Sequence, residues 1–332
     1  MQDRANAERP SSREIVLHVV AIVPNALEFH HAPELQWAQL DMRAVQPPIA
    51  DTRQPKLIAP PGACDTHLHV YGPLDRYPLV AERNYDPDPH STLDDYLKVH
   101  RALGLERAVI VTGSGNGTNN RITLDALQRM KGSFKGLALL DPAITDTELL
   151  QLKKDGFTGF RIKANGRGGL SFEEAKRMTA RTAGFGWHIE FMSQSMAEVI
   201  GAVSFLNSLN VPYVFDHVAH AEPHQSNNDL EFRELLAILK NEEHAWINLY
   251  SFYQLSESGP PDYSDMVDVV RLIIENRPDR VIWGSNWPHG GIAVPMPNDG
   301  DLLDFLLAVT PEEHSRQSIL VDNPAKLYGW FS

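Results

Sequence analysis

Short apolar runs alternate with amphipathic segments along most of this chain, and this alternation restricts its fold more than any other feature. Eight runs are rich in β-branched and aromatic residues and end in polar residues or glycine. The predicted strands are 63–69, 107–112, 136–141, 157–163, 186–191, 211–217, 245–250 and 280–285. Because a helical segment separates each pair, neighbouring strands must be parallel. The pattern predicts the α/β class with a closed (β/α)8 TIM-type barrel, and a doubly wound open sheet is the alternative.

Helix start signals support these assignments. Ser171 precedes one predicted helix and Glu174 follows three residues later, which is the spacing of a capping box. The predicted helices cover 92–103, 120–131, 147–155, 172–182, 194–208, 228–241, 262–276, 299–309 and 323–328. We expect residues 61–332 to form the barrel and residues 1–60 an N-terminal extension. Its first dozen residues are polar, so it should be partly flexible.

Composition narrows the class of protein. The formal net charge of -13 over 332 residues opposes binding to nucleic acid or to an anionic membrane, because such a field repels phosphates. The apolar run at 15–23 is interrupted by His18 and is too short to span a bilayer. Cys64 is the only cysteine, which excludes an internal disulfide and fits a reducing compartment. We expect a cytoplasmic globular protein.

Polar side chains fall where the predicted strands end. His67 and His69 alternate with apolar residues on the first strand, so both imidazoles face the same side. Arg161 ends the fourth strand, His217 the sixth, and Asn286 follows the eighth. The carboxyl ends of barrel strands surround one mouth, where active sites of this architecture lie. The sequence therefore predicts one site built from residues far apart in the chain.

Four motifs carry a more specific signal. They are DTHLHVYGP at 65–73, VFDHVAH at 214–220, VIWGSNWPHG at 281–290 and DNPAKLYGW at 322–330. In this order they resemble the amidohydrolase superfamily, in the branch of 2-pyrone-4,6-dicarboxylate lactonases, 4-sulfomuconolactone hydrolases and aldarolactone isomerases. The resemblance implies a hydrolase in the breakdown of aromatic compounds. It would open a small anionic lactone by attack of water on the ester carbonyl.

The resemblance also assigns roles. The catalytic residues it implies are His67, His69, His217 and position 286, and the substrate-binding residues are Tyr85, Ser114, Arg161 and Arg167. Arginines suit this task because a planar guanidinium holds carboxylate or sulfonate oxygens in bidentate fashion. In a chain of net charge -13 they would supply a local positive pocket.

Two positions depart from the family pattern. The family places an aspartate after strand eight to take a proton from water, whereas this chain has Asn286, and a neutral amide is no general base. Three explanations stay open: an engineered substitution that traps substrate, a natural residue that orients water while His217 or His289 moves the proton, or a loss of hydrolysis. An arginine after strand seven corresponds to Gln254, which casts doubt on the pyrone dicarboxylate as substrate.

The sequence leaves alternatives open for the cofactor, the reaction and the oligomeric state. Because Asn286 removes an anionic ligand, we expect no metal, and zinc held by His67, His69 and His217 is the minority interpretation. The alternative functions are an aldarolactone isomerase, a metal-dependent amidohydrolase-type hydrolase or decarboxylase, and a barrel that binds acidic lactones without turnover. We expect a monomer or small homo-oligomer.

Overall fold

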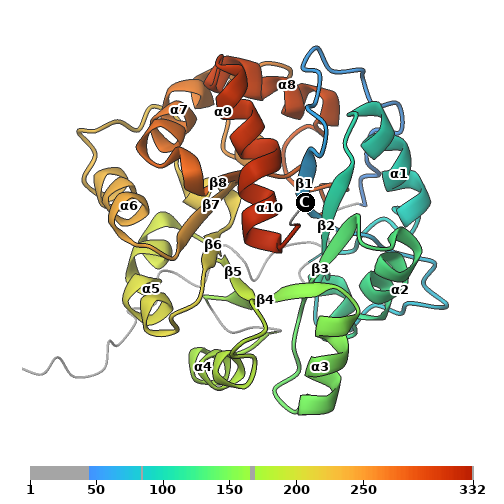
Figure 1. Ribbon diagram of the computed structural model, residues 1–332. Helices are drawn as coiled ribbons and strands as arrows, with labels where there is room; N and C mark the ends of the chain where they lie inside the picture. The colour runs from blue at the N-terminus through green and yellow to red at the C-terminus, as the bar shows by residue number, and fades with distance from the viewer. Residues whose placement is uncertain (1–44, 84, 165–168, 331–332) are drawn as a thin grey trace, which may run out of the picture. The chain divides into compact units, whose positions relative to one another are not determined.

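The computed structural model describes residues 45–83, 85–164 and 169–330, which contain a sheet of eight parallel strands in chain order (Figure 1). The strands are β1 (Cys64–Leu68), β2 (Arg107–Val111), β3 (Phe134–Ala138), β4 (Phe157–Lys163), β5 (His188–Met192), β6 (Tyr213–Phe215), β7 (Ala245–Leu249) and β8 (Val281–Trp283). All eight coincide with predicted runs, with shifts of up to three residues at their ends. The predicted TIM-type barrel is confirmed.

The barrel closes between β1 and the residues that follow β8. The Asn286 N–H donates to the His67 carbonyl at 2.8 Å, and the His69 N–H donates to the Trp287 carbonyl at 2.7 Å. Gly284 permits this approach, because a Cβ there would lie 2.8 Å from the His67 Cβ. The open-sheet alternative is therefore wrong. Closure also places Asn286 directly beside the His-x-His strand.

Helices follow the strands and surround the barrel (Figure 1). They are α1 (Leu93–Ala102), α2 (Arg121–Met130), α3 (Asp146–Lys154), α4 (Phe172–Arg181), α5 (Met196–Ser208), α6 (Leu230–Asn241), α7 (Val267–Asn276), α8 (Asp299–Val309), α9 (Glu313–Gln317) and α10 (Asn323–Tyr328). The capping box of Ser171 and Glu174 forms as predicted, and Thr145 forms a second one with Glu148. The short α9 was not predicted. No helix in the described ranges has the length and apolar character needed to cross a membrane.

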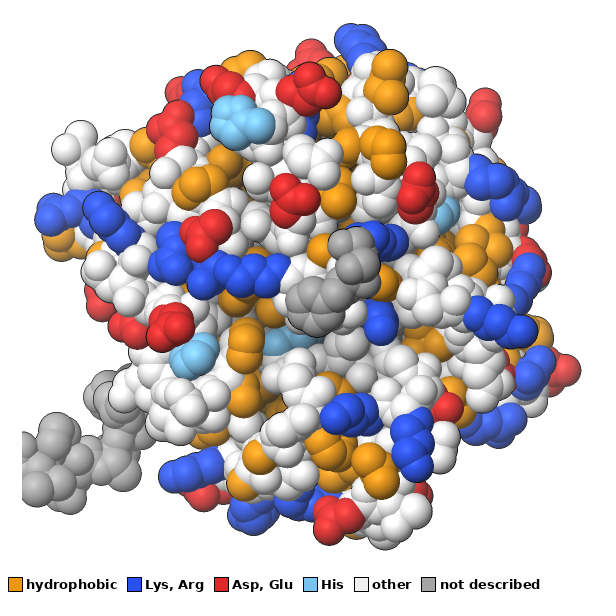
Figure 2. All heavy atoms as spheres, in the orientation of Figure 1, with side chains coloured by type: hydrophobic (Ala, Val, Ile, Leu, Met, Phe, Trp, Pro, Cys, Tyr) orange, Lys and Arg blue, Asp and Glu red, His pale blue; other side chains and the backbone are white. Residues whose placement is uncertain are grey.

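The amino ends of the strands are closed by the C-terminal segment. Tyr328 of α10 joins the inner core with Val109, Leu137 and Val214, and the Trp330 indole donates to the carbonyl of Gly132, just before β3, at 2.8 Å. Figure 1 views this end, with α10 in front of the strands. Figure 2 shows basic and acidic side chains interspersed over the same face. Because this view shows the amino ends of the strands, their carboxyl ends face away from the viewer.

The segment before β1 is bonded to α8. Arg53 forms ion pairs of 2.6 Å with both Asp301 and Asp304, and the Leu57 N–H donates to Asp304 at 2.8 Å. The Leu57 side chain is buried in the main core. Residues 1–44 of the predicted extension lie outside the described residues, so the extension stays a prediction there.

Candidate active site

His67 and His69 face each other inside the carboxyl end of the barrel. Their Nε2 atoms are 3.3 Å apart, the His69 Nδ1 is 2.8 Å from the Val111 carbonyl oxygen, and the His67 Nδ1 is 3.2 Å from Glu190 Oε2. Both rings are buried, and burial lowers the pKa of each well below its usual value. The two imidazoles are therefore neutral near pH 7.

These contacts fix where the protons lie. A carbonyl only accepts, so His69 carries its proton on Nδ1 and its Nε2 presents a lone pair. The His67 Nε2 must then donate, which leaves its Nδ1 as the acceptor of a proton from Glu190. Burial raises the pKa of Glu190 to about 7, against the opposing charge of Arg161. In this arrangement the Glu190 carboxyl is protonated and donates to the His67 Nδ1.

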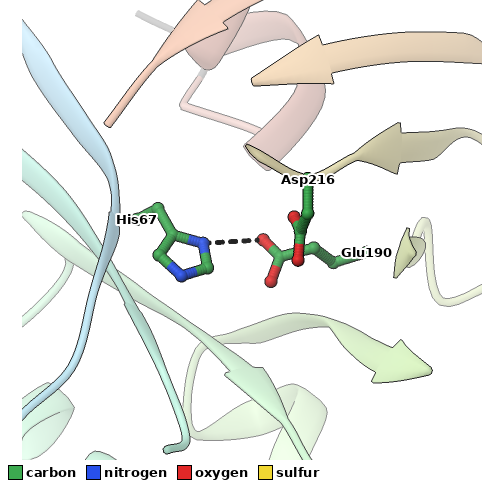
Figure 3. Close-up of side chains that lie close together, drawn as sticks. All are labelled: His67, Glu190 and Asp216. Carbon is green, nitrogen blue, oxygen red and sulfur yellow. Dashed lines mark hydrogen bonds and ion pairs between the residues drawn. The ribbon is translucent and has the colours of Figure 1, made fainter. Parts of the chain in front are cut away.

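Arg161 lies between two buried carboxyl groups. Its Nε is 3.1 Å from Glu190 Oε1 and 3.1 Å from Asp216 Oδ2, and its Nη2 is 3.1 Å from the Tyr250 hydroxyl. Figure 3 shows Glu190 and Asp216 converging with His67. Burial raises the pKa of Asp216, and Arg161 opposes this shift. The guanidinium is 5% exposed, so most of its donors serve the protein itself.

Tyr250 separates His67 from His217. The ring of Tyr250 stacks on His67 at 3.9 Å between centroids and lies 4.8 Å from the ring of His217. His217 begins a left-handed turn, with φ of +51°, a conformation that non-glycine residues adopt at a cost in strain. Burial, then the charge of His220, lowers the pKa of His217. The strained turn holds a neutral imidazole near the histidine pair.

Tyr85 and Ser114 lie together on another side of the mouth. The Tyr85 hydroxyl is 2.7 Å from that of Tyr71, and the ring lies against Gly290, where a Cβ would come within 2.5 Å. Burial raises the pKa of Tyr85, while a hydrogen bond with Ser114 opposes the shift. The two predicted substrate contacts therefore share one polar patch.

Lys163 is a site residue that lies at the end of the predicted fourth strand and to which the sequence assigned no role. It follows Arg161 by two positions on β4, so its side chain faces the same interior side. It is 7% exposed, and within the described ranges its ammonium has no hydrogen bond or ion pair. Burial, with the charge of Arg161, lowers its pKa to about 8. Lys163 is thus a cation with donors to spare at the mouth.

Asn286 is held by its amide nitrogen. Nδ2 donates to Ser251 Oγ at 2.9 Å and to the Tyr253 hydroxyl at 3.0 Å. The residue has φ of +63°, which asparagine tolerates better than most residues. Its Oδ1 accepts no hydrogen bond from the described residues, which leaves this oxygen to orient a water molecule or a substrate hydroxyl.

One group of donors could hold a metal ion. His67, Glu190 and Asp216 offer ligand atoms that all lie within 4.8 Å of one another. The predicted minority set of His67, His69 and His217 is not the set that the described residues bring together. Imidazole and carboxylate suit zinc, but here the Arg161 guanidinium already lies against both carboxyl groups.

The predicted residues thus meet at one mouth, with one position outside the described ranges. His67 contacts His69, Asn286 bonds to the His67 backbone, and His217 adjoins them through Tyr250. Arg167 falls in the undescribed residues 165–168. Sequence reasoning left Glu190 without a role and gave none to Asp216. Their positions on the interior side of β5 and after β6 were the signal that could have found them.

The fold and this histidine-rich mouth define an amidohydrolase-type barrel. The amidohydrolase family model matches residues 64–330, so the chain belongs to that family and the predicted membership is confirmed. The 4-sulfomuconolactone hydrolase of Hydrogenophaga intermedia is 36% identical over 82% of this chain and 91% of its own. The 2-pyrone-4,6-dicarboxylate hydrolase of Comamonas testosteroni is 32% identical over 84% of this chain and 94% of its own. A solved apo structure from Agrobacterium tumefaciens is 26% identical, with a TM-score of 0.74 over 84% of this chain and 99% of that one.

Proposed function

We propose that this protein is a hydrolase that opens a small anionic lactone by attack of water on the ester carbonyl, in the cytoplasmic breakdown of aromatic compounds. The observation that carries the proposal is a buried cluster of neutral imidazoles at the mouth where barrel enzymes react, together with Lys163, whose ammonium has no partner among the described residues. The relatives, which are named for lactone hydrolysis and match most of this chain, support the same reaction.

The histidines polarise the carbonyl. In the free enzyme the His67 Nε2–H donates to the His69 lone pair. A lactone carbonyl oxygen beside this pair competes for that proton, and the competition strengthens as negative charge develops on the oxygen. The His217 imidazole adds a second donor from the far side of Tyr250. Preorganised donors in a buried site act this way because they need no reorganisation during the reaction.

The acidic group of the lactone binds to Lys163, with Tyr85 and Ser114 as polar partners. Lys163 takes this role before Arg161, because the guanidinium is already shared by Glu190, Asp216 and Tyr250. Arg161 therefore acts on the substrate mainly through its charge. Arg167 stays a predicted substrate contact.

The site works without a metal ion. The Arg161 guanidinium lies 3.1 Å from a carboxyl oxygen of both Glu190 and Asp216, so a cation already stands where a metal ion would need these two groups as free ligands. The fit of these residues to a guanidinium is better than their fit to a divalent ion. No step of the reaction is assigned to a metal.

The test is a panel of sulfonated and carboxylated lactones, incubated with purified protein with and without a strong chelator and followed by product identification. We expect ring-opened acids, formed at equal rates in both conditions. The variant His67→Ala should lose at least tenfold in rate, because it removes a carbonyl donor. Products that keep the lactone ring would assign the protein as an isomerase. Stoichiometric zinc on which the rate depends would contradict the metal-free site.

A further inference from the structure

A chain of buried side chains leads away from Asn286 towards α8. The Tyr253 hydroxyl accepts from Asn286 Nδ2 at 3.0 Å and lies 2.9 Å from His289 Nδ1. On the other side of this imidazole, Nε2 lies 3.2 Å from Oδ1 of Asp299. Tyr253, His289 and Asp299 are 2%, 1% and 1% exposed, so water does not replace these contacts. The function proposed above assigns no step to these three residues.

The contacts among Tyr253, His289 and Asp299 determine which atom carries each proton. The Asp299 carboxylate only accepts, so His289 carries its proton on Nε2. The Nδ1 lone pair then takes the Tyr253 hydroxyl proton, and the Tyr253 oxygen turns its own lone pairs towards Asn286. This is the arrangement of a hydroxyl activated by an imidazole that a carboxylate holds in position.

Three residues around these side chains have a strained backbone conformation. Ser251, Asn286 and His289 have φ of +62°, +63° and +62°, in the left-handed region. Non-glycine residues hold such conformations only where the surrounding contacts impose them, and they gather at functional sites. In this conformation the Asn286 amide reaches the Tyr253 hydroxyl, while the Asn286 backbone N–H donates to the carbonyl of His67.

We propose that Tyr253, His289 and Asp299 form the proton acceptor for the attacking water, a role that the neutral amide of Asn286 cannot fill. Asn286 Oδ1 orients the water through one O–H. As the water oxygen bonds to the carbonyl carbon, its other proton passes to the Tyr253 oxygen and the tyrosine proton passes to His289 Nδ1. Asp299 stabilises the imidazolium. When the ester C–O bond breaks, His289 Nδ1 returns its proton to the Tyr253 oxygen and the Tyr253 hydroxyl gives one proton to the leaving oxygen, so one water has been added across the bond.

This inference rests on the proposed lactone hydrolysis, and its test is run on a lactone that the wild type opens. Tyr253→Phe deletes the hydroxyl and His289→Gln deletes the base. Each should lower kcat about 100-fold, the usual size of general-base catalysis, with KM nearly unchanged. The double variant should be no slower than either single variant, since both lie on one proton path. Tyr263→Phe is the matched control, because its buried hydroxyl has no hydrogen-bond partner among the described residues and kcat should not change.

The same substitution of Tyr253 in an Asn286→Asp variant distinguishes a role in proton transfer from a structural role. In Asn286→Asp a carboxylate takes the water proton directly, so adding Tyr253→Phe should change kcat less than about threefold. A purely structural tyrosine would lower kcat equally in both backgrounds, which would overturn the relay. Full activity of Tyr253→Phe in the wild-type background would also overturn it. If the wild type opens no lactone in the panel, the proposed function itself is wrong and the relay falls with it.

Discussion

Among the site residues, Lys163 gives the strongest indication of the charge of the substrate. It is a buried ammonium without a partner in the described ranges, in a protein of formal net charge -13. Such a group is costly to keep unless a ligand pairs with it. Arg161, two residues earlier on the same strand, has by contrast its Nε and Nη2 bonded to the carboxyl groups of Glu190 and Asp216. We therefore infer that Lys163 binds the ligand and that Arg161 stabilises the fold.

The first prediction concerns Lys163→Met, which removes the charge and keeps most of the side-chain length. We expect KM for an anionic lactone to rise about 10- to 100-fold, as for loss of a hydrogen bond to a charged group, with little change for an uncharged lactone. The measurement is steady-state kinetics on both substrates. An unchanged KM for the anionic lactone would remove Lys163 from the binding site.

The pH dependence of KM follows from the same residue. The pKa of Lys163 is lowered to about 8, so the ammonium is present below pH 8 and lost as the pH rises through that value. KM for the anionic lactone should therefore rise above pH 8 in the wild type. In Lys163→Arg the side chain stays charged, so KM should stay level across the same range. A rise of equal size in both proteins would assign the effect to another group.

The junction between β1 and β8 depends on Asp65. Its Oδ1 accepts from the backbone N–H groups of Ser285 and His67, and its Oδ2 accepts from the hydroxyls of Ser285 and Tyr96 at 2.6 and 3.0 Å. Burial raises the pKa of Asp65 to about 6 despite these donors. The Asp65 carboxylate therefore bonds Tyr96 of α1 and Ser285, which lies two residues after β8, to the strand that carries both histidines.

The corresponding prediction is that Tyr96→Phe lowers the free energy of unfolding by about 2 kcal/mol at pH 8, since it deletes a hydrogen bond to a charged acceptor. A raised pKa makes Asp65 stabilising below pH 4, with that stability lost as the pH rises through 6. Removing a donor raises the pKa further, so the loss in Tyr96→Phe should be smaller at pH 4 than at pH 8. Urea unfolding at both pH values measures it, with Tyr263→Phe as the matched control.

The elements also show what the sequence can predict. Eight strands follow from apolar runs and intervening helices, because these patterns are local. Their exact ends do not: β3 begins at Phe134, two residues before the predicted start, because pairing with Ala108 of β2 sets its register. The histidine pair was predictable from alternation on one strand. The Tyr253–His289 contact was not, because it joins two loops through left-handed residues whose geometry depends on barrel closure.

The barrel includes part of the chain that precedes its first strand. Arg53 pairs with two aspartates of α8, and Leu57 is 4% exposed within the main core. The exposed ion pairs contribute little by themselves, since Arg53 is 39% exposed and such pairs are worth at most about 1 kcal/mol. Burial of Leu57 is the larger contribution to holding this segment on the helix layer.

Leu57 and Ile58 provide a matched comparison of that contribution, because they are adjacent aliphatic residues at 4% and 92% exposure. Leu57→Ala should lower the free energy of unfolding by about 2–4 kcal/mol, through lost burial and the cavity left behind. Ile58→Ala should change it by less than about 0.5 kcal/mol, as surface substitutions do. Urea unfolding of the full chain measures both. Equal, small effects would mean that the segment is appended to the barrel and not part of its fold. A large effect of Leu57→Ala alone, with the lactone-opening rate unchanged below the unfolding transition, would show that this segment stabilises the barrel from the side of α8 without shaping its mouth.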